Sequence, residues 1–84
     1  MSARGMFEEL GYKLDQVEED SRLYCRDILD ENTFGYKDSE MIYFDGEYFG
    51  IYFTNKEYVN IKELRAINKQ IEELHWNEWG MERN

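Results

Sequence analysis

The chain contains no proline, one cysteine and one histidine among its 84 residues. With Cys25 alone, no disulfide framework can form within the chain, so the sequence favours a reducing compartment. A structural zinc site takes about four nitrogen or sulfur ligands, and Cys25 and His75 supply only two such side chains. The scarcity of both residue types argues against a disulfide-stapled domain and against a zinc domain.

Long apolar runs are missing as well. No stretch of about 18 consecutive apolar residues occurs, so we expect no membrane-spanning segment. Residues 1–5 contain one arginine and no apolar segment, and they do not resemble a secretory signal peptide. We therefore expect a cytoplasmic protein.

Basic residues are few: 10 Lys and Arg stand against 19 Asp and Glu, which gives a formal net charge of -9. This charge repels phosphate backbones, so we expect neither nucleic acid nor anionic lipid as a direct ligand. Aromatic residues make up 17% of the chain, which favours a folded acidic body over a disordered acidic tail. The length predicts one small domain over residues 1–84, with flexible ends at 1–5 and 80–84.

Hydrophobic spacing predicts an α+β fold with a short helix, a three-stranded antiparallel sheet and a closing helix. The first helix has apolar residues at helical spacing, namely Ala3, Met6, Phe7 and Leu10. Gly11 suits the position just past its end. We expect residues 12–20 to form a surface turn with Leu14 and Val17 turned inward. Residues 22–29 are predicted as a strand and residues 30–39 as a loop.

The clearest local signal lies in residues 41–53, where Asp45-Gly46 separates two aromatic and β-branched runs. This pattern predicts a two-residue hairpin that pairs Phe44 with Glu47 and completes a three-stranded meander. Side chains alternate between two faces. We call one the Ile/Phe face: Ile42, Phe44, Phe49, Ile51 and Phe53. We call the other the Tyr face: Met41, Tyr43, Tyr48, Gly50 and Tyr52.

The closing helix has both a start signal and an apolar stripe. Asn60 is a good N-cap, and Glu63 completes a capping-box pattern. We expect the stripe to pack on the Ile/Phe face of the hairpin, and the stripe consists of Ile61, Leu64, Ile67, Ile71 and Leu74. The residues expected to lie away from this stripe are Lys62, Arg65, Lys69, Gln70, Glu72 and Glu73.

Two segments carry a family resemblance: Met6-Phe-Glu-Glu-Leu-Gly-Tyr12, and Ile61-Lys-Glu-Leu-Arg-Ala-Ile-Asn-Lys-Gln-Ile-Glu-Glu-Leu-His-Trp76. They resemble the ends of small proteins encoded by phages and prophages of Firmicutes, which are mostly of unknown function. This chain departs from the family pattern at His75, where glycine is usual, and in its longer tail. The resemblance implies a mobile-element origin and a bacterial host cytoplasm, and it supplies no catalytic or binding residues.

Three patterns that would carry chemistry are incomplete. Asp30 to Gly35 resembles the opening of a calcium-binding EF-hand loop, but Phe34 and Met41 stand where oxygen ligands are needed. Cys25 and His75 could form a nucleophile–base pair, although a cysteine inside a strand is usually a small buried hydrophobe. We therefore expect no cofactor, no metal and no enzymatic activity.

Two surface features remain as candidates for binding. The Tyr face and the tryptophans Trp76 and Trp79 are either interface or structural filler, because the same residue types are enriched at binding hot spots and in strands. The acidic surface is either a partner-binding surface or an ordinary solubilising one. The candidate contact residues are Glu18, Glu19, Asp20, Asp30, Glu31, Glu40, Tyr43, Asp45, Glu47, Tyr48, Tyr52 and Trp79.

Our leading hypothesis is a non-enzymatic acidic phage-type protein that inhibits a basic, nucleic-acid-handling host protein. A folded acidic surface can imitate the charges of nucleic acid in a channel lined with Lys and Arg. A CRISPR effector or another defence or replication factor would be such a target. The alternative hypothesis is a self-associating structural or accessory phage protein, in which the hairpin edge or the tryptophans form a homodimer.

Overall fold

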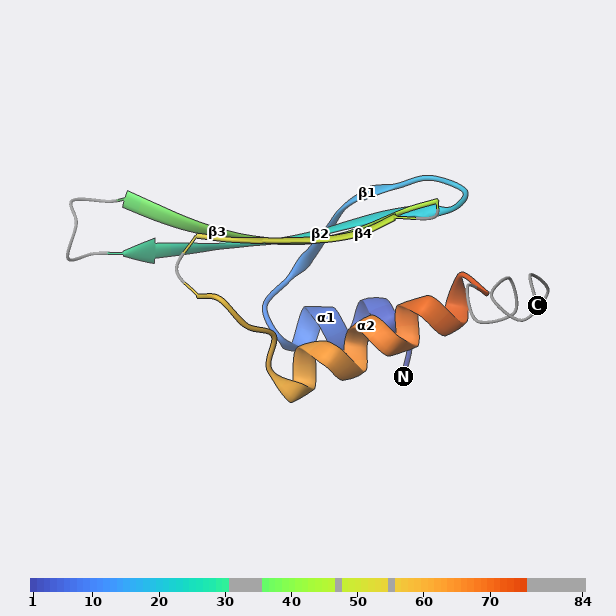
Figure 1. Ribbon diagram of the computed structural model, residues 1–84. Coiled ribbons are helices and arrows are strands. Elements are labelled where there is room, and N and C mark those ends of the chain that lie inside the picture. The colour runs from blue at the N-terminus through green and yellow to red at the C-terminus, as the bar shows by residue number, and fades with distance from the viewer. Residues whose placement is uncertain (31–35, 47, 55, 76–84) are drawn as a thin grey trace.

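Figure 1 shows the computed structural model, in which both helices lie on one side of a four-stranded antiparallel sheet. The structure describes residues 1–30, 36–46, 48–54 and 56–75, with only the backbone described for 28–30 and 36–38. The elements in chain order are α1 (Ala3–Glu9), β1 (Lys13–Val17), β2 (Ser21–Asp30), β3 (Tyr36–Asp45), β4 (Tyr48–Phe53) and α2 (Ile61–Glu73). The predicted α+β class is confirmed, but the prediction of three strands is wrong.

The additional strand is β1, which lies where the sequence predicted a surface turn. It pairs with β2, and the register shifts between Leu14 and Gln16, which indicates a bulge. The bulge interrupts the alternation of side chains that would reveal a strand in the sequence. Leu14 is partly buried as expected, but Val17 is 58% exposed, so its predicted inward position is wrong. Val17 is the last residue of an edge strand, where neighbours cover less of a side chain.

The two central strands, β2 and β3, are longer than the strands predicted from the sequence. β2 confirms the strand predicted over residues 22–29, and β3 begins at Tyr36, inside the predicted loop. The bend expected at Gly35 and the whole 31–35 segment lie outside the described residues. The strand order is β1-β2-β3-β4, so β1 and β4 are the two edges of the sheet.

The hairpin between β3 and β4 forms, but its register differs by two residues from the predicted one. Asp45 pairs with Tyr48 and Phe44 pairs with Phe49, so Asp45 and Tyr48 are the last pair before the turn. Gly46 has a φ of 61°, which a tight hairpin turn requires and which glycine adopts without strain. Because the shift is an even number of residues, the Ile/Phe face and the Tyr face keep their predicted members.

The first helix is confirmed, and it begins at Ala3, the first residue of the predicted helical pattern. The side chain of Ser2 caps it, and the fully buried Ala3 donates its N–H to Glu73 of α2 over 2.8 Å. Residues 3–5, which fall in the end that we expected to be flexible, lie in this packed helix. Gly11 follows the helix with a φ of 94°, as the sequence predicted.

The second helix begins at the predicted cap but presents a different face to the sheet. Asn60 and Glu63 bond reciprocally over 2.8 and 3.0 Å and form a capping box. However, Ile61 is 61% exposed and Leu64 is 47% exposed, so the predicted packing of these two residues is wrong. The residues of α2 that are buried are Glu63, Ala66, Ile67 and Gln70. The helix is thus rotated about its axis toward its polar side.

The core lies between the two helices and the Ile/Phe face. Phe7 of α1 stacks on Tyr24 of β2, with ring centroids 3.9 Å apart, and meets Tyr12 edge-on at 5.7 Å. Phe44 closes this aromatic cluster at 6.4 Å from both Phe7 and Tyr24. These rings give a small domain much of its buried apolar area.

Candidate interaction surface

The Tyr face is the side of the sheet that neither helix covers (Figure 1). Its tyrosines are exposed to different degrees: 42% for Tyr43, 73% for Tyr48 and 54% for Tyr52. Both helices pack on the opposite face, so the alternation of β3 and β4 turns these rings outward. A row of exposed tyrosines combines apolar area with hydroxyl groups, which is the composition found at protein interfaces.

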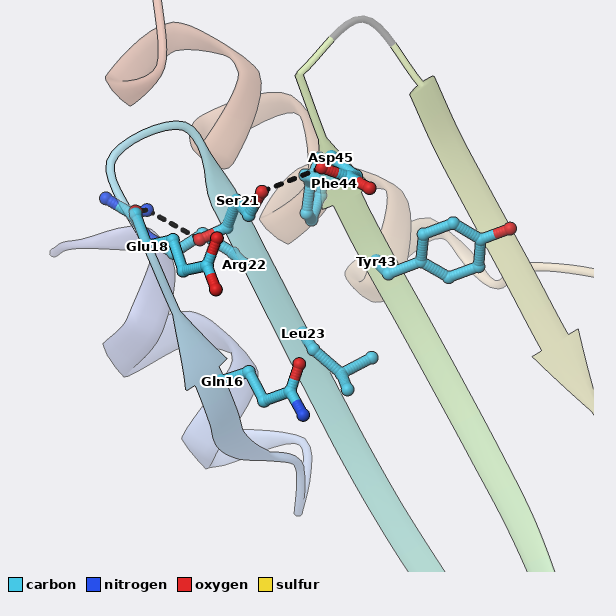
Figure 2. Close-up of a pocket in the computed structure, with 8 residues that line it drawn as sticks. All are labelled: Gln16, Glu18, Ser21, Arg22, Leu23, Tyr43, Phe44 and Asp45. Carbon is cyan, nitrogen blue, oxygen red and sulfur yellow. Dashed lines mark hydrogen bonds between the residues drawn. The ribbon is translucent and has the colours of Figure 1, made fainter.

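Glycine at position 50 fixes how one of these rings lies. A Cβ atom added to Gly50 would come within 1.9 Å of Cζ of Tyr43, its cross-strand partner. The Tyr43 ring therefore lies directly over the backbone of Gly50, and in Figure 2 it extends from β3 toward β4. Tyr43 is held flat on the sheet, which reduces the entropy that the ring would lose on contact with a partner.

Acidic side chains gather at the end of the sheet where its two hairpin turns meet. The N–H of Gly46 donates to the carbonyl of Asp20 over 3.2 Å and joins the β1–β2 turn to the β3–β4 turn. The Ser21 hydroxyl donates to Oδ1 of Asp45 over 2.9 Å (Figure 2). We call this region the acidic end, and its described carboxylates are Glu18, Glu19, Asp20 and Asp45, all exposed.

A surface hollow of about 280 Å³ connects the acidic end with the Tyr face. Figure 2 shows its lining residues, which come from β1, the β1–β2 turn, β2 and β3. In Figure 2, Glu18 lies on the β1 side of the hollow and Asp45 and Tyr43 lie on its β3 side, with Leu23 of β2 between them. Its one cation, Arg22, donates to the backbone carbonyls of Glu18 and Ser21. The guanidinium therefore bonds to the turn itself, and the hollow offers carboxylates beside an aromatic ring.

The structure brings together six of the predicted contact residues and separates or omits the others. Glu18, Glu19, Asp20 and Asp45 meet at the acidic end, and Tyr43 borders them across the hollow. Tyr48 follows the same turn on β4. Tyr52 lies farther along that strand. Glu31, Glu47 and Trp79 lie outside the described residues, as does Trp76, and only the backbone of Asp30 is described.

One predicted contact residue, Glu40, is placed elsewhere, so its expected surface role is wrong. It is 2% exposed and faces the helices. The alternation of β3 already contained this result, because Glu40 shares its face with Ile42 and Phe44. An acidic residue on a core face was the signal in the sequence for a buried charge with a partner.

Glu40 belongs to a buried polar layer between the sheet and α2, which consists of Tyr12, Arg26, Glu40, Lys56 and Glu63. Arg26 donates from Nε to Oε2 of Glu40 over 2.9 Å, and Lys56 Nζ lies 2.7 and 2.8 Å from the two carboxylate oxygens of Glu63. The Tyr12 hydroxyl donates to Oε2 of Glu63 over 2.5 Å and lies 3.2 Å from Oε2 of Glu40. Two carboxylates thus face two cations.

This layer explains the rotation of α2 that the apolar stripe did not predict. Glu63 must face inward to meet Lys56 and Tyr12. About two helical turns later, on the same side of α2, Gln70 accepts a hydrogen bond from the Tyr24 hydroxyl over 2.5 Å. Buried polar groups without partners are costly, so these bonds determine which side of the helix meets the sheet. Ile61 and Leu64 are turned to the flank as a consequence.

Burial and hydrogen bonding shift the ionisation of three members of the core. Burial, with a further contribution from Glu73, raises the pKa of Tyr24 to about 12. Burial and the bond to Glu63 raise the pKa of Tyr12 far above its ordinary value. For Glu63, burial acts to raise the pKa, but the hydrogen bonds from Lys56, Tyr12 and the Asn60 backbone outweigh it and lower the pKa. The native layer therefore holds neutral phenols and an ionised carboxylate.

The candidate nucleophile and base of the sequence are on opposite sides of the sheet. Cys25 neighbours the inward-facing Tyr24 on β2 and so points to the Tyr face, whereas His75 follows α2 on the helix side. Burial and the carboxylates of Asp15 and Asp27 raise the pKa of the Cys25 thiol, which disfavours the reactive thiolate. Within the described residues, no group of three or more His, Cys, Asp or Glu side chains is placed to hold a metal ion.

Comparison with known proteins adds no family to this picture. No family model matches the chain, and neither the curated proteins nor the solved structures contain a significant match. The resemblance to phage proteins therefore stays a prediction. Neither helix in the described part of the chain has the length and apolar character that crossing a membrane requires.

Proposed function

We propose that this protein is a non-enzymatic acidic binding protein that inhibits a basic, nucleic-acid-handling protein of a bacterial host. The acidic end supplies carboxylates to a Lys- and Arg-lined site on the target, and the Tyr face supplies the contact area beside them. The observation that carries this proposal is the hollow in Figure 2, where Glu18 and Asp45 adjoin Tyr43 on a side of the sheet without helices.

Electrostatics supports the choice of a basic target. The chain has a net charge of -9, and four of its carboxylates meet at one end with Arg22 bonded to backbone carbonyls. A concentrated charge of this kind accelerates association with an oppositely charged surface, and salt screens the effect. Exposed tyrosines then slow dissociation, because buried aromatic contacts dominate binding energy at most interfaces.

The resemblance of residues 6–12 and 61–76 to phage proteins supports the host-directed part of the proposal. A protein of this size that occupies a nucleic-acid channel blocks the channel without chemistry of its own. Defence nucleases such as CRISPR effectors, and replication factors, have channels of the required charge.

The test is affinity capture from a bacterial host lysate with a matched pair of variants. The first variant removes three of the four charges of the acidic end with Glu18→Gln, Glu19→Gln and Asp20→Asn. The control removes the same charge from exposed helix positions with Glu8→Gln, Glu9→Gln and Glu72→Gln. We expect the wild-type chain and the control to retain a basic nucleic-acid-binding protein that the first variant loses.

Two results would contradict the proposal. One is a captured set that does not differ between the two variants, because the acidic end would then have no part in binding. The other is a target whose binding to nucleic acid is unaffected by a stoichiometric excess of this protein. For the purified pair, we expect the association rate to fall steeply as salt is raised, as for other steered complexes.

A further inference from the structure

The outer edge of β4 lacks the features that usually protect an edge strand. Its sequence from Tyr48 to Phe53 contains no charged residue and no proline, and its pairing with β3 has no register shift. No described residue pairs with its outer side. The opposite edge, β1, is bulged and carries Lys13 and Asp15. Natural edges are commonly blocked by charges and bulges, so β4 is the edge left open for pairing.

The pairing of β3 with β4 determines which backbone groups point outward. Thr54 donates its N–H to the carbonyl of Ser39 over 3.2 Å, so this pair is hydrogen-bonded. Hydrogen-bonded and non-hydrogen-bonded pairs alternate along antiparallel strands. Counting back from Thr54, the backbone groups of Phe49, Ile51 and Phe53 are directed away from β3. They form a short row of outward donors and acceptors centred on Ile51.

Apolar side chains flank this edge on the helix side. Phe49 is 42% exposed and Ile51 is 38% exposed, although both belong to the Ile/Phe face. Leu64 lies nine residues from Glu73, which places the two on opposite sides of α2. Glu73 bonds to α1, and α1 lies near β1, so Leu64 faces the β4 side of the molecule. The helices thus leave an apolar strip beside the open edge.

We infer that β4 pairs antiparallel with β4 of a second copy of this chain, about a two-fold axis at Ile51. The outward groups of Phe49 bond to those of Phe53 in the other copy, and Ile51 meets its own equivalent. An isologous contact of this kind is self-complementary and closed, so it ends at the dimer. The two sheets become one sheet of eight strands, and Leu64 of each copy lies at the junction.

The distribution of charge favours a second copy over other occupants. Residues 48–65, which form β4 and the start of α2, hold three basic and two acidic residues, whereas the chain as a whole carries -9. This region of the chain is therefore close to neutral, and two copies of an acidic protein repel each other least where it lies. A partner rich in Lys and Arg would instead be drawn to the acidic end.

The test is the mass of the full chain in solution, measured by sedimentation over a wide concentration series. We expect a reversible dimer of the 10.3 kDa chain. Ile51→Lys places two lysines against each other at the axis and is expected to raise the dimer dissociation constant about a hundredfold or more. Val17→Lys puts the same charge on the exposed β1 edge and is expected to leave the dimer intact.

A cross-link tests the register and does not depend on how Ile51→Lys folds. In a Cys25→Ser background, Ile51→Cys brings two thiols together across the axis, and mild oxidation should give a covalent dimer. Val17→Cys in the same background should give none beyond random collision. A wild-type chain that stays monomeric throughout the series, or equal cross-linking of both variants, would overturn the inference.

This dimer is independent of the proposed inhibition. The pairing uses the edge and the helix side of β4 and leaves the Tyr face and the acidic end accessible. Ile51→Lys tests the dimer without altering the acidic end, and the glutamine and asparagine variants test target capture without altering the edge. Loss of one property with the other intact identifies which proposal has failed.

Discussion

The covered face of the sheet buries charged side chains, and the bare face exposes aromatic ones. Hydrophobicity alone would predict the opposite. The covered face holds a buried polar layer with two carboxylates, a guanidinium and an ammonium group, in which each cation lies within 4.0 Å of both carboxylates. The bare face holds three exposed tyrosines. The two faces differ in how their polar groups are satisfied. Each charged group of the buried polar layer has an opposite charge beside it, whereas the tyrosines of the bare face are exposed to solvent.

This comparison assigns different roles to the two faces. A buried network with balanced charges stabilises one packing of α2 against others, because any other rotation would leave a charge without a partner. An exposed aromatic face contributes little to folding and is free to bind. The predictions below test that difference, in order of decreasing effect.

The largest effect is expected for Glu63→Ala. This change removes the partner of Lys56, the acceptor of Tyr12 and half of the capping box at Asn60. Loss of one member of a buried ion pair costs about 3–5 kcal/mol of the free energy of unfolding. Tyr52→Ala on the bare face should cost about 0.5 kcal/mol. Urea titrations of both variants measure the difference, and similar losses would remove the distinction between the faces.

The next effect is a loss of stability at alkaline pH. Because the folded pKa of Tyr24 is raised to about 12, its contribution is complete below the ordinary value of 10.0 and is lost as the pH rises toward 12. The loss is on the order of 1 kcal/mol per pH unit. Urea midpoints measured against pH should show it. Tyr24→Phe should weaken this dependence, and Tyr48→Phe on the bare face should leave it unchanged.

The covered face also predicts a loss of stability in acid. The pKa of Glu63 is lowered, so its contribution is complete above the ordinary value of 4.5 and falls as the pH drops through the lower folded value. Glu63→Gln should flatten this part of the pH profile of the unfolding free energy. If the unfolding free energy of that variant falls at low pH as steeply as that of the wild-type chain, other carboxylates cause the loss.

A smaller effect is expected at Gly50. Gly50→Ala puts a methyl group where the Tyr43 ring lies, so the exposed ring must rotate away. We expect a cost of about 1 kcal/mol, because a side chain at the surface can move. In the Tyr43→Ala background the same change should cost less, since no ring remains to displace. A double-mutant cycle with urea unfolding measures this coupling, and additive costs would contradict it.

The only gain in stability is expected at the end of α2. His75 has a φ of 62°, a conformation that is costly for residues other than glycine. His75→Gly should stabilise the protein by about 1 kcal/mol and raise the melting temperature by about 4–8 °C. His75→Ala keeps the unfavourable conformation and should give no gain in calorimetry.

Local features were predictable because they depend on neighbouring residues alone. The capping box at Asn60, the positive φ of Gly11 and the two faces of the hairpin all follow from short sequence patterns. β1 was missed because its bulge breaks the period of two. The hairpin register was wrong because two adjacent positions for a two-residue turn both satisfy the local pattern.

The candidate surface was predictable in its parts but not in its arrangement. The exposed tyrosines follow from alternation, yet only the packing of both helices on one side leaves that face bare. The meeting of Asp20 and Asp45 depends on two turns that are distant in the sequence. The alternation of β3 could have excluded Glu40 from the candidate contact residues. Glu40 lies two residues from Ile42 and therefore shares its buried face.

The sequence by itself determined the α+β class, the ends of the helices and the membership of the two faces, since these depend on spacing along the chain. The tertiary structure decided the rotation of α2, because Glu63 and Gln70 are buried with partners from other segments of the chain. It also decided which carboxylates are exposed. Spacing is a property of one segment, whereas satisfaction of a buried charge is a property of several segments brought together.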